Sequence, residues 1–307
     1  MRSRSRSGSA HSPGPGAVGL ALSCAALLLL GCSARGSDKS NSGVPTPSAA
    51  GQINTTLAEY LGEGHSHFQV LASRTVDEMT IVVFGFRSAG TQAAAIARVV
   101  SSHGALDVAE FNQLPVVPRE LQGPGFTALV ELPGPGWSAF AGFVDEKATE
   151  VRLLNIEGRP IDTAAPTSGA VVVVGAEPAQ IQVFSGIRLI AARSASTSDE
   201  RGENLTAPSS RTARIAASRF INAILRGDAS EAEDQVAGWI SAHRLVVPLM
   251  NLVSREAKVV GDGPAPGGRT FTISYPGGDV ADLTVLIADQ ERTPAVVYYY
   301  EYRLRSG

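Results

Sequence analysis

The clearest indication of fold in this sequence is a series of short runs of β-branched and aromatic residues, with Gly and Pro between them. These runs lie within residues 60–193, and the last three follow each other at spacings of about 8–10 residues. They are Met79–Phe86, Phe126–Leu132, Val151–Ile156, Ala170–Val174, Gln180–Phe184 and Ile187–Ala192. Short strands separated by turn residues are typical of sandwiches and barrels. We therefore expect an all-β sandwich domain over residues 60–193.

One stretch of this domain is ambiguous. In Thr91–His103 the alanines favour a helix, whereas Ile96, Val99 and Val100 allow a strand. We predict a strand, because Thr149–Gly158 likewise combines a short Val/Leu run, an Arg and a turn glycine. With that strand, the domain resembles an immunoglobulin-like β-sandwich. The resemblance implies architecture only, since such sandwiches recur without shared function.

Residues 211–307 begin with apolar residues at helical rather than strand spacing. Seven apolar residues lie at helical spacing and form one stripe: Ala213, Ala216, Ala217, Phe220, Ile221, Ile224 and Leu225. Gly227 supplies a C-terminal stop, and Asp228 and Ser230 can cap a second helix, roughly Glu231–Ser241. Four strands are expected next, at Leu249–Val260, Arg269–Tyr275, Asp282–Ala288 and Ala295–Arg303. The fold class is thus mixed: a β-sandwich followed by an α+β domain of two helices and a four-strand antiparallel meander.

The stretch Ala217–Asp228, ASRFINAILRGD, followed by strands only, resembles the nuclear-transport-factor-2-like fold. That resemblance implies a curved sheet around a long N-terminal helix, with a cone-shaped pocket. Some members of the family use the pocket for catalysis, and many use it for binding or assembly. No catalytic motif of the family can be placed in this sequence.

The N-terminus has the pattern of an export signal. Arg2, Arg4 and Arg6 precede the apolar run Ala17–Leu30. As a helix this run would rise about 21 Å, less than the ~30 Å hydrocarbon core of a bilayer. A cationic start followed by a short apolar run is typical of a secretory signal.

The run ends in Leu29-Leu30-Gly31-Cys32, which resembles the lipobox of bacterial lipoproteins. The resemblance implies cleavage after Gly31 and lipidation of Cys32, which would hold the chain on a bilayer. The alternatives are that Cys32 ends a plain secretory signal or a short spanning helix. We expect an extracytoplasmic protein, lipid-anchored to the cell membrane or the outer membrane.

Composition shifts divide the chain further. The Ser-, Gly-, Pro- and Thr-rich residues 32–59 are expected to form a flexible tether after the signal peptide, residues 1–31. Residues 194–210 contain one Leu among many polar residues, and we expect a linker there. The predicted domains are therefore 60–193 and 211–307.

Composition also excludes several functions. With 26 Lys and Arg against 29 Asp and Glu, the chain is mildly acidic and has no basic cluster suited to nucleic acid. Its two cysteines are Cys24, in the expected signal peptide, and Cys32. Without another thiol, an internal disulfide, a Cys-based zinc site and a thiol nucleophile are excluded. With 44% apolar residues the chain can build cores without disulfides.

Candidate site residues are few. Tyr298, Tyr300 and Tyr302 alternate on the terminal strand and are expected to share one face with Val296. With Trp239 they are candidate binding residues, since amphipathic aromatics suit ligand or protein contact. The alternative is that one face of this strand packs on the helix and the other is solvated or lies at the domain seam.

No catalytic, metal or cofactor site is expected. His65 and His67 would point the same way on a strand, but no third ligand is suitably spaced, so surface histidines are the preferred interpretation. The motif G-x-S-x-G of one common hydrolase class does not occur.

The sequence favours a non-catalytic binding or assembly module of the bacterial cell envelope, with an envelope protein as its partner. The alternative is a small-molecule carrier or an enzyme that uses a pocket in the C-terminal domain. A third possibility is a structural spacer.

Overall fold

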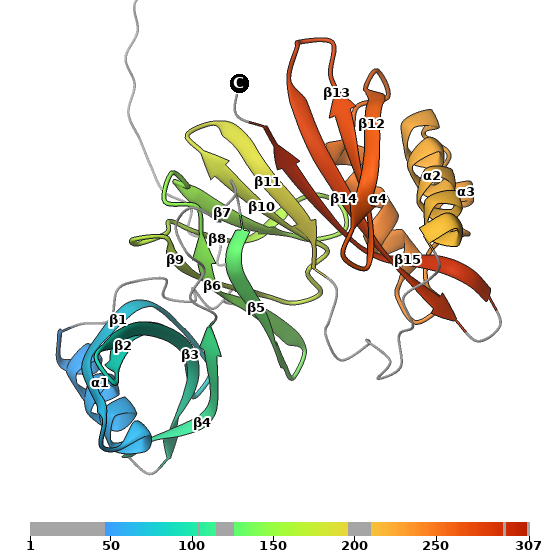
Figure 1. Ribbon diagram of the computed structural model, residues 1–307. Coiled ribbons are helices and arrows are strands. Elements are labelled where there is room, and N and C mark those ends of the chain that lie inside the picture. Colours follow the sequence, from blue (N-terminus) through green and yellow to red (C-terminus); the bar gives the residue numbers. More distant parts are fainter. Residues whose placement is uncertain (1–46, 103–104, 115–125, 196–209, 291–292, 306–307) are drawn as a thin grey trace, which may run out of the picture. The chain divides into compact units, whose positions relative to one another are not determined.

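The computed structural model describes residues 47–102, 105–114, 126–195, 210–290 and 293–305. The fold is mostly β, with antiparallel sheets and few helices (Figure 1). Cys32 and the expected signal peptide lie outside the described residues. Within these ranges, no helix is long and apolar enough to cross a membrane.

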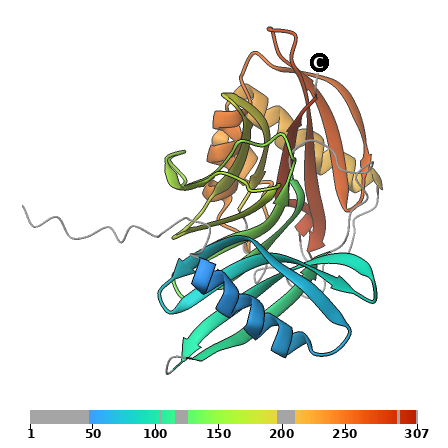
Figure 2. The same ribbon diagram turned by 90° about the vertical axis from the view of Figure 1, so that its left-hand side faces the viewer.

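The first region is a helix followed by a four-strand meander. α1 (Pro47–Leu61) precedes β1 (His65–Val76), β2 (Met79–Ser88), β3 (Thr91–Ser102) and β4 (Ala105–Leu114), which pair in sequence order. Figure 2 shows α1 lying across the curved sheet. The predicted strand at Thr91–His103 is confirmed by β3.

The helix α1 occupies residues that were expected to belong to the tether. Ile53 and Leu57, one turn apart, are buried among the phenylalanines of the meander. Packing of this narrow apolar stripe orders a segment whose composition is otherwise polar, because most helical stability comes from tertiary contact.

The middle region consists of two packed sheets. β5 (Phe126–Gly134), β6 (Trp137–Val144) and β9 (Ala170–Gly175) form one sheet. The strands β7 (Glu150–Leu154), β8 (Pro160–Ala164), β10 (Gln180–Ser185) and β11 (Arg188–Ser194) belong to the other. Phe140 and Val173 of the first sheet share a buried core with Leu153, Ile181 and Val183 of the second.

The C-terminal region is built of helices and a second meander. Its helices are α2 (Ser210–Arg226), α3 (Ala229–Glu233) and α4 (Ala242–Leu252). Its strands are β12 (Lys258–Ala265), β13 (Gly268–Ser274), β14 (Val280–Gln290) and β15 (Thr293–Leu304). As predicted, α2 stops directly before Gly227, whose φ is +71°, and the side chain of Asp228 caps the next helix.

Two local predictions here are wrong. The expected helix Glu231–Ser241 is replaced by the short α3, and α4 covers the start of the strand expected at Leu249–Val260. Leu245, Val246 and Leu249 lie at helical spacing, and all three are buried in the core under the sheet. A short apolar run does not distinguish a buried helix from a buried strand, and here the packing favours the helix.

The second meander continues into the middle region. Its strand β15 pairs with β11, with Ala192 opposite Tyr302, and the sheet runs in the order β12-β13-β14-β15-β11-β10-β7-β8. The sheet therefore contains strands from both sides of the expected linker. The division into two domains stays a prediction.

Candidate functional site

The candidate site is the face of β12–β15 that points away from the helices, which we call the outer face. On β14, Leu283 and Val285 are buried in the core shared with α2 and α4. Asp282 and Thr284 occupy the alternate positions and are only half-buried. Because successive side chains of a strand point to opposite sides, both lie on the outer face.

Cross-strand register extends this face into two rows. One row consists of Gly261, Thr272, Asp282 and Arg303, and the other of Gly263, Thr270, Thr284 and Glu301. Residues directly opposite each other in an antiparallel pair lie on the same side of the sheet. The outer face therefore changes from glycine at β12, through threonine, to charged residues at β15.

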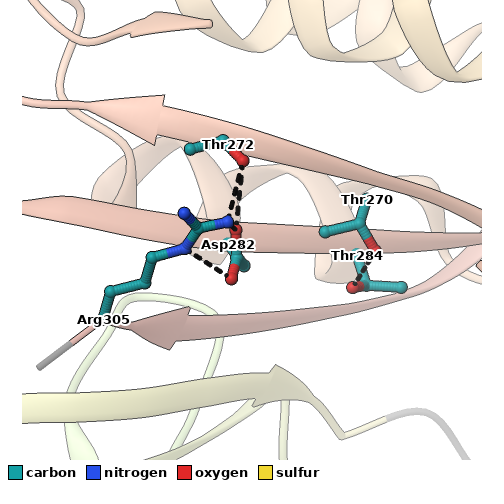
Figure 3. Close-up of polar contacts among 5 residues, drawn as sticks. All are labelled: Thr270, Thr272, Asp282, Thr284 and Arg305. Atoms are coloured by element: carbon teal, nitrogen blue, oxygen red, sulfur yellow. Dashed lines mark hydrogen bonds and ion pairs between the residues drawn. The ribbon is translucent and has the colours of Figure 1, made fainter. Parts of the chain in front are cut away.

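Asp282 of the first row forms a bidentate ion pair with Arg305 (Figure 3). Arg305, just after β15, donates to Asp282 through Nε at 2.9 Å and Nη2 at 2.7 Å. Thr272 Oγ1 donates to Asp282 Oδ1 at 3.2 Å and accepts from Arg305 Nη2 at 3.1 Å. Paired hydrogen bonds between guanidinium and carboxylate fix orientation as well as charge.

The second row contains a pair of threonines and a carboxylate that pairs with an arginine of the first row. The hydroxyls of Thr270 and Thr284 are 2.8 Å apart, and Arg303 donates to Glu301 at 2.7 Å. At the β12 end, a Cβ added at Gly263 would meet no atom within 4 Å. The space above Gly263 is therefore open, and no side chain projects from this position.

The arrangement is suited to contact rather than to acid–base chemistry. The Asp282 carboxylate already accepts hydrogen bonds from Arg305 and Thr272, and Glu301 accepts from Arg303. Each threonine hydroxyl of this face keeps hydrogen-bonding capacity beyond its contact within the sheet. Such groups can donate to and accept from a partner that lies flat on the sheet.

The predicted common face of Val296, Tyr298, Tyr300 and Tyr302 is wrong. Leu286 lies opposite Tyr299, but the next residue, Ile287, lies opposite Val297, so a bulge removes Tyr298 from the ladder. A bulge places one extra residue in a strand and shifts its alternation. Val297 therefore shares the helix-side core with Tyr300 and Tyr302. This burial is the packing arrangement that the sequence left open as the alternative.

Tyr300 links two strands within the core. Gln180 Nε2 donates to the Tyr300 hydroxyl at 2.7 Å, and Gln182 Nε2 donates to Gln180 Oε1 at 2.6 Å. Burial raises the pKa of Tyr300 well above its usual range. The pKa of Tyr302 is also raised, mainly by burial.

The chain segments that carry Trp239 and Tyr298 are joined by backbone contacts. Val236 bridges to Val297, and Ala237 N–H donates to the Val297 carbonyl at 2.9 Å. Both aromatic residues are half-buried. The four candidate residues are thus divided: Tyr300 and Tyr302 lie in the core, whereas Trp239 and Tyr298 lie at the bulged end of β15.

The two histidines near α1 do not converge. His67 has a φ of 57°, which breaks the strand alternation, and its Nδ1 lies 3.0 Å from the Ser66 hydroxyl. The ring of His65 lies against Phe86, with centroids 5.6 Å apart. Among the described residues, no group of three or more His, Cys, Asp or Glu is placed to hold a metal ion.

The outer face is not apparent from the sequence alone. The alternation in Thr270–Ile273 and Asp282–Val285 indicates two strands with one polar side each. This alternation could have indicated a polar face. That the two strands are neighbours, and that Arg305 reaches Asp282, follows only from the strand register.

Comparison with models of protein families, with curated proteins and with solved structures finds no match for this chain.

Proposed function

We propose that this chain is a lipid-anchored extracytoplasmic module of the bacterial cell envelope that binds or assembles a protein partner. In this proposal it is acylated at Cys32 and located at the cell membrane or the outer membrane. A β-sandwich domain over residues 60–193 is followed by an α+β domain over 211–307. The anchor is supported by the order of cationic start, apolar run and Leu29–Cys32.

The outer face carries the binding part of the proposal. Its carboxylates accept hydrogen bonds from arginines, and its threonine hydroxyls, including the Thr270–Thr284 pair, keep hydrogen-bonding capacity beyond their contacts within the sheet. A surface of this kind contributes hydrogen bonds at a contact, which is typical of the polar parts of an interface. Trp239 and Tyr298 remain candidate contact residues, since half-buried aromatics are favoured at interfaces.

The anchor is tested by metabolic labelling with a fatty acid. We expect wild type to incorporate the label and to fractionate with membranes, and Cys32→Ala to lose the label. Cys24→Ala is the matched control, because it removes the only other cysteine and keeps the lipobox. If Cys32→Ala kept both its label and its membrane fraction, the anchor would be disproved.

The binding face is tested by affinity purification from solubilised membranes. Thr284→Arg places a long charged side chain in the middle of the outer face, where it would block a flat partner. Thr91→Arg adds the same side chain at an exposed position of β3. We expect proteins captured by wild type and by Thr91→Arg to be lost specifically with Thr284→Arg. Equal capture by all three forms would exclude this face as the binding surface.

A further inference from the structure

The exposed side of α2 is rich in arginine. The helix contains Arg211, Arg214, Arg219 and Arg226 and no acidic residue. Its apolar stripe is buried in the core, including Phe220, Ile221 and Ile224. The exposed residues recur on the opposite side, and they are Arg211, Arg214, Ile215, Arg219, Asn222 and Arg226.

The four arginines differ in their surroundings. Arg226 pairs with Glu231, and Arg214 Nε lies 3.5 Å from Asp262, which also pairs with Arg269. Among the described residues, Arg211 and Arg219 have no ion-pair partner. They lie two turns apart, roughly 12 Å along the helix. The side of α2 between them is therefore positively charged and not neutralised.

Exposed apolar side chains accompany this charge. Ile215 lies between Arg211 and Arg219 at i+4 spacing and is 47% exposed. The contact of Arg214 with Asp262 places the edge strand β12 beside α2. Near the start of β12, Val259 is 38% and Val260 62% exposed. Lys258 is also exposed there and adds a further positive charge.

We propose that this arginine face of α2, together with Ile215, Val259 and Val260, docks on the surface of an anionic bilayer. Arginines near such a surface are attracted by phosphate headgroups, and adjacent aliphatic side chains can enter the boundary between headgroups and acyl chains. An acidic protein would satisfy the arginines but offers no general reason for protruding valines and isoleucine beside them. The bilayer is therefore the favoured occupant.

The proposal adds a second membrane contact to the lipid anchor. The expected lipid anchor attaches the chain to the bilayer at one end only, and a basic patch is a common additional membrane contact. Docking by α2 would restrict how the anchored chain is oriented on the surface. It does not depend on Cys32, so it can be tested without the acyl group.

The test measures co-sedimentation of residues 32–307 carrying Cys32→Ser with vesicles. The vesicles contain either phosphatidylcholine alone or phosphatidylcholine with about one third phosphatidylglycerol. We expect binding only to the anionic vesicles, and its loss when the salt is raised from about 0.1 M to about 0.5 M. Arg211→Gln with Arg219→Gln should weaken binding about 30-fold.

The matched control is Arg87→Gln with Arg159→Gln, which removes the same charge at two exposed positions elsewhere. It should bind as wild type does, and Ile215→Ser should weaken binding to a smaller extent than the double Arg variant. Equal loss in both double variants would mean that only net charge matters, and would overturn the proposal. Binding to polyglutamate without binding to vesicles would overturn it in favour of an acidic protein partner. Failure of fatty-acid labelling at Cys32 would leave this result unaffected.

Discussion

The two meanders of this molecule share a topology and differ in what their faces do. Strands β1–β4 follow α1, and strands β12–β15 follow α2–α4, each set pairing in sequence order. In the first meander both faces of β2 are buried, with Phe84 on the side of α1 and Val83 in a core shared with β6 and β9. In the second meander only the helix side is buried, and Asp282 and Thr284 are on the other side.

The difference comes from the strand sequences. The central strand β2 reads MTIVVFGFRS, a nearly continuous apolar run, whereas β14 reads VADLTVLIADQ and alternates over its first half. A strand with a continuous apolar run must be buried on both faces of its sheet, whereas a strand that alternates apolar and polar residues needs burial on one face only. The same connectivity therefore yields a fully buried sheet in one place and an available surface in the other.

The ion pairs of the two meanders differ in the same way, since one is buried and the other is exposed to water. Arg74 of β1 pairs with Asp162 of β8 at 2.5 Å, with side-chain exposures of 3% and 8%. Val174 N–H also donates to Asp162 at 2.8 Å. Burial raises the pKa of Asp162, and Arg74 and the Val174 N–H oppose the shift. The Asp282–Arg305 pair of the outer face is 29% and 53% exposed, so water screens it.

The largest expected effect is in the first meander. Phe84→Ala removes a fully buried ring that packs on other rings of the cluster, and should lower the free energy of unfolding by about 3–5 kcal/mol. Thr284→Ala, at a central position of the second meander, should change it by less than about 0.5 kcal/mol. Urea denaturation measures both. Similar values for the two variants would break the distinction between the meanders.

An intermediate effect is expected where the second meander joins the middle strands. Tyr300→Phe leaves the Gln180 amide without its hydroxyl acceptor and should cost about 1–2 kcal/mol at neutral pH. The pKa of Tyr300 is raised in the fold, so wild type should lose stability as the pH rises above the ordinary tyrosine pKa. Unfolding then releases a proton that the folded state retains.

In Tyr300→Phe that alkaline loss should be shallower, by up to about 1.4 kcal/mol per pH unit. The pKa values of Tyr302 and Tyr275 are also raised, so part of the alkaline loss of stability should remain in this variant. Tyr60→Phe, at an exposed position, is the control. An unchanged slope in Tyr300→Phe would show that this hydroxyl is not buried in solution.

The smallest expected effect is on the outer face. Asp282→Asn should lower the free energy of unfolding by less than about 1 kcal/mol, because its pair with Arg305 is exposed. In about 1 M salt the difference from wild type should nearly vanish. Thermal unfolding at low and high salt measures this. A large loss that persists in salt would mean that the outer face is structural, and would weaken its assignment as a contact surface.

Local patterns predicted the elements that local chemistry controls. The β-rich character, the strand at Thr91–His103 and the helix ending at Gly227 were accessible because propensity, periodicity and capping agree there. The strand expected at Leu249 was wrong, since the apolar run of α4 fits either structure until its packing is known. The outer face was missed because its residues come from four strands and from Arg305 beyond them.

The sequence by itself determined which residues can be buried and which strands keep a polar side, since those depend on the order of apolar and polar residues. It also carries the pattern at Cys32 on which the proposed anchor rests. Only the tertiary structure decided that Tyr298 leaves the ladder, that Tyr300 meets Gln180, and that the second meander continues into β11. Those outcomes depend on register between strands far apart in the chain, and a shift of one residue moves every side chain to the opposite face.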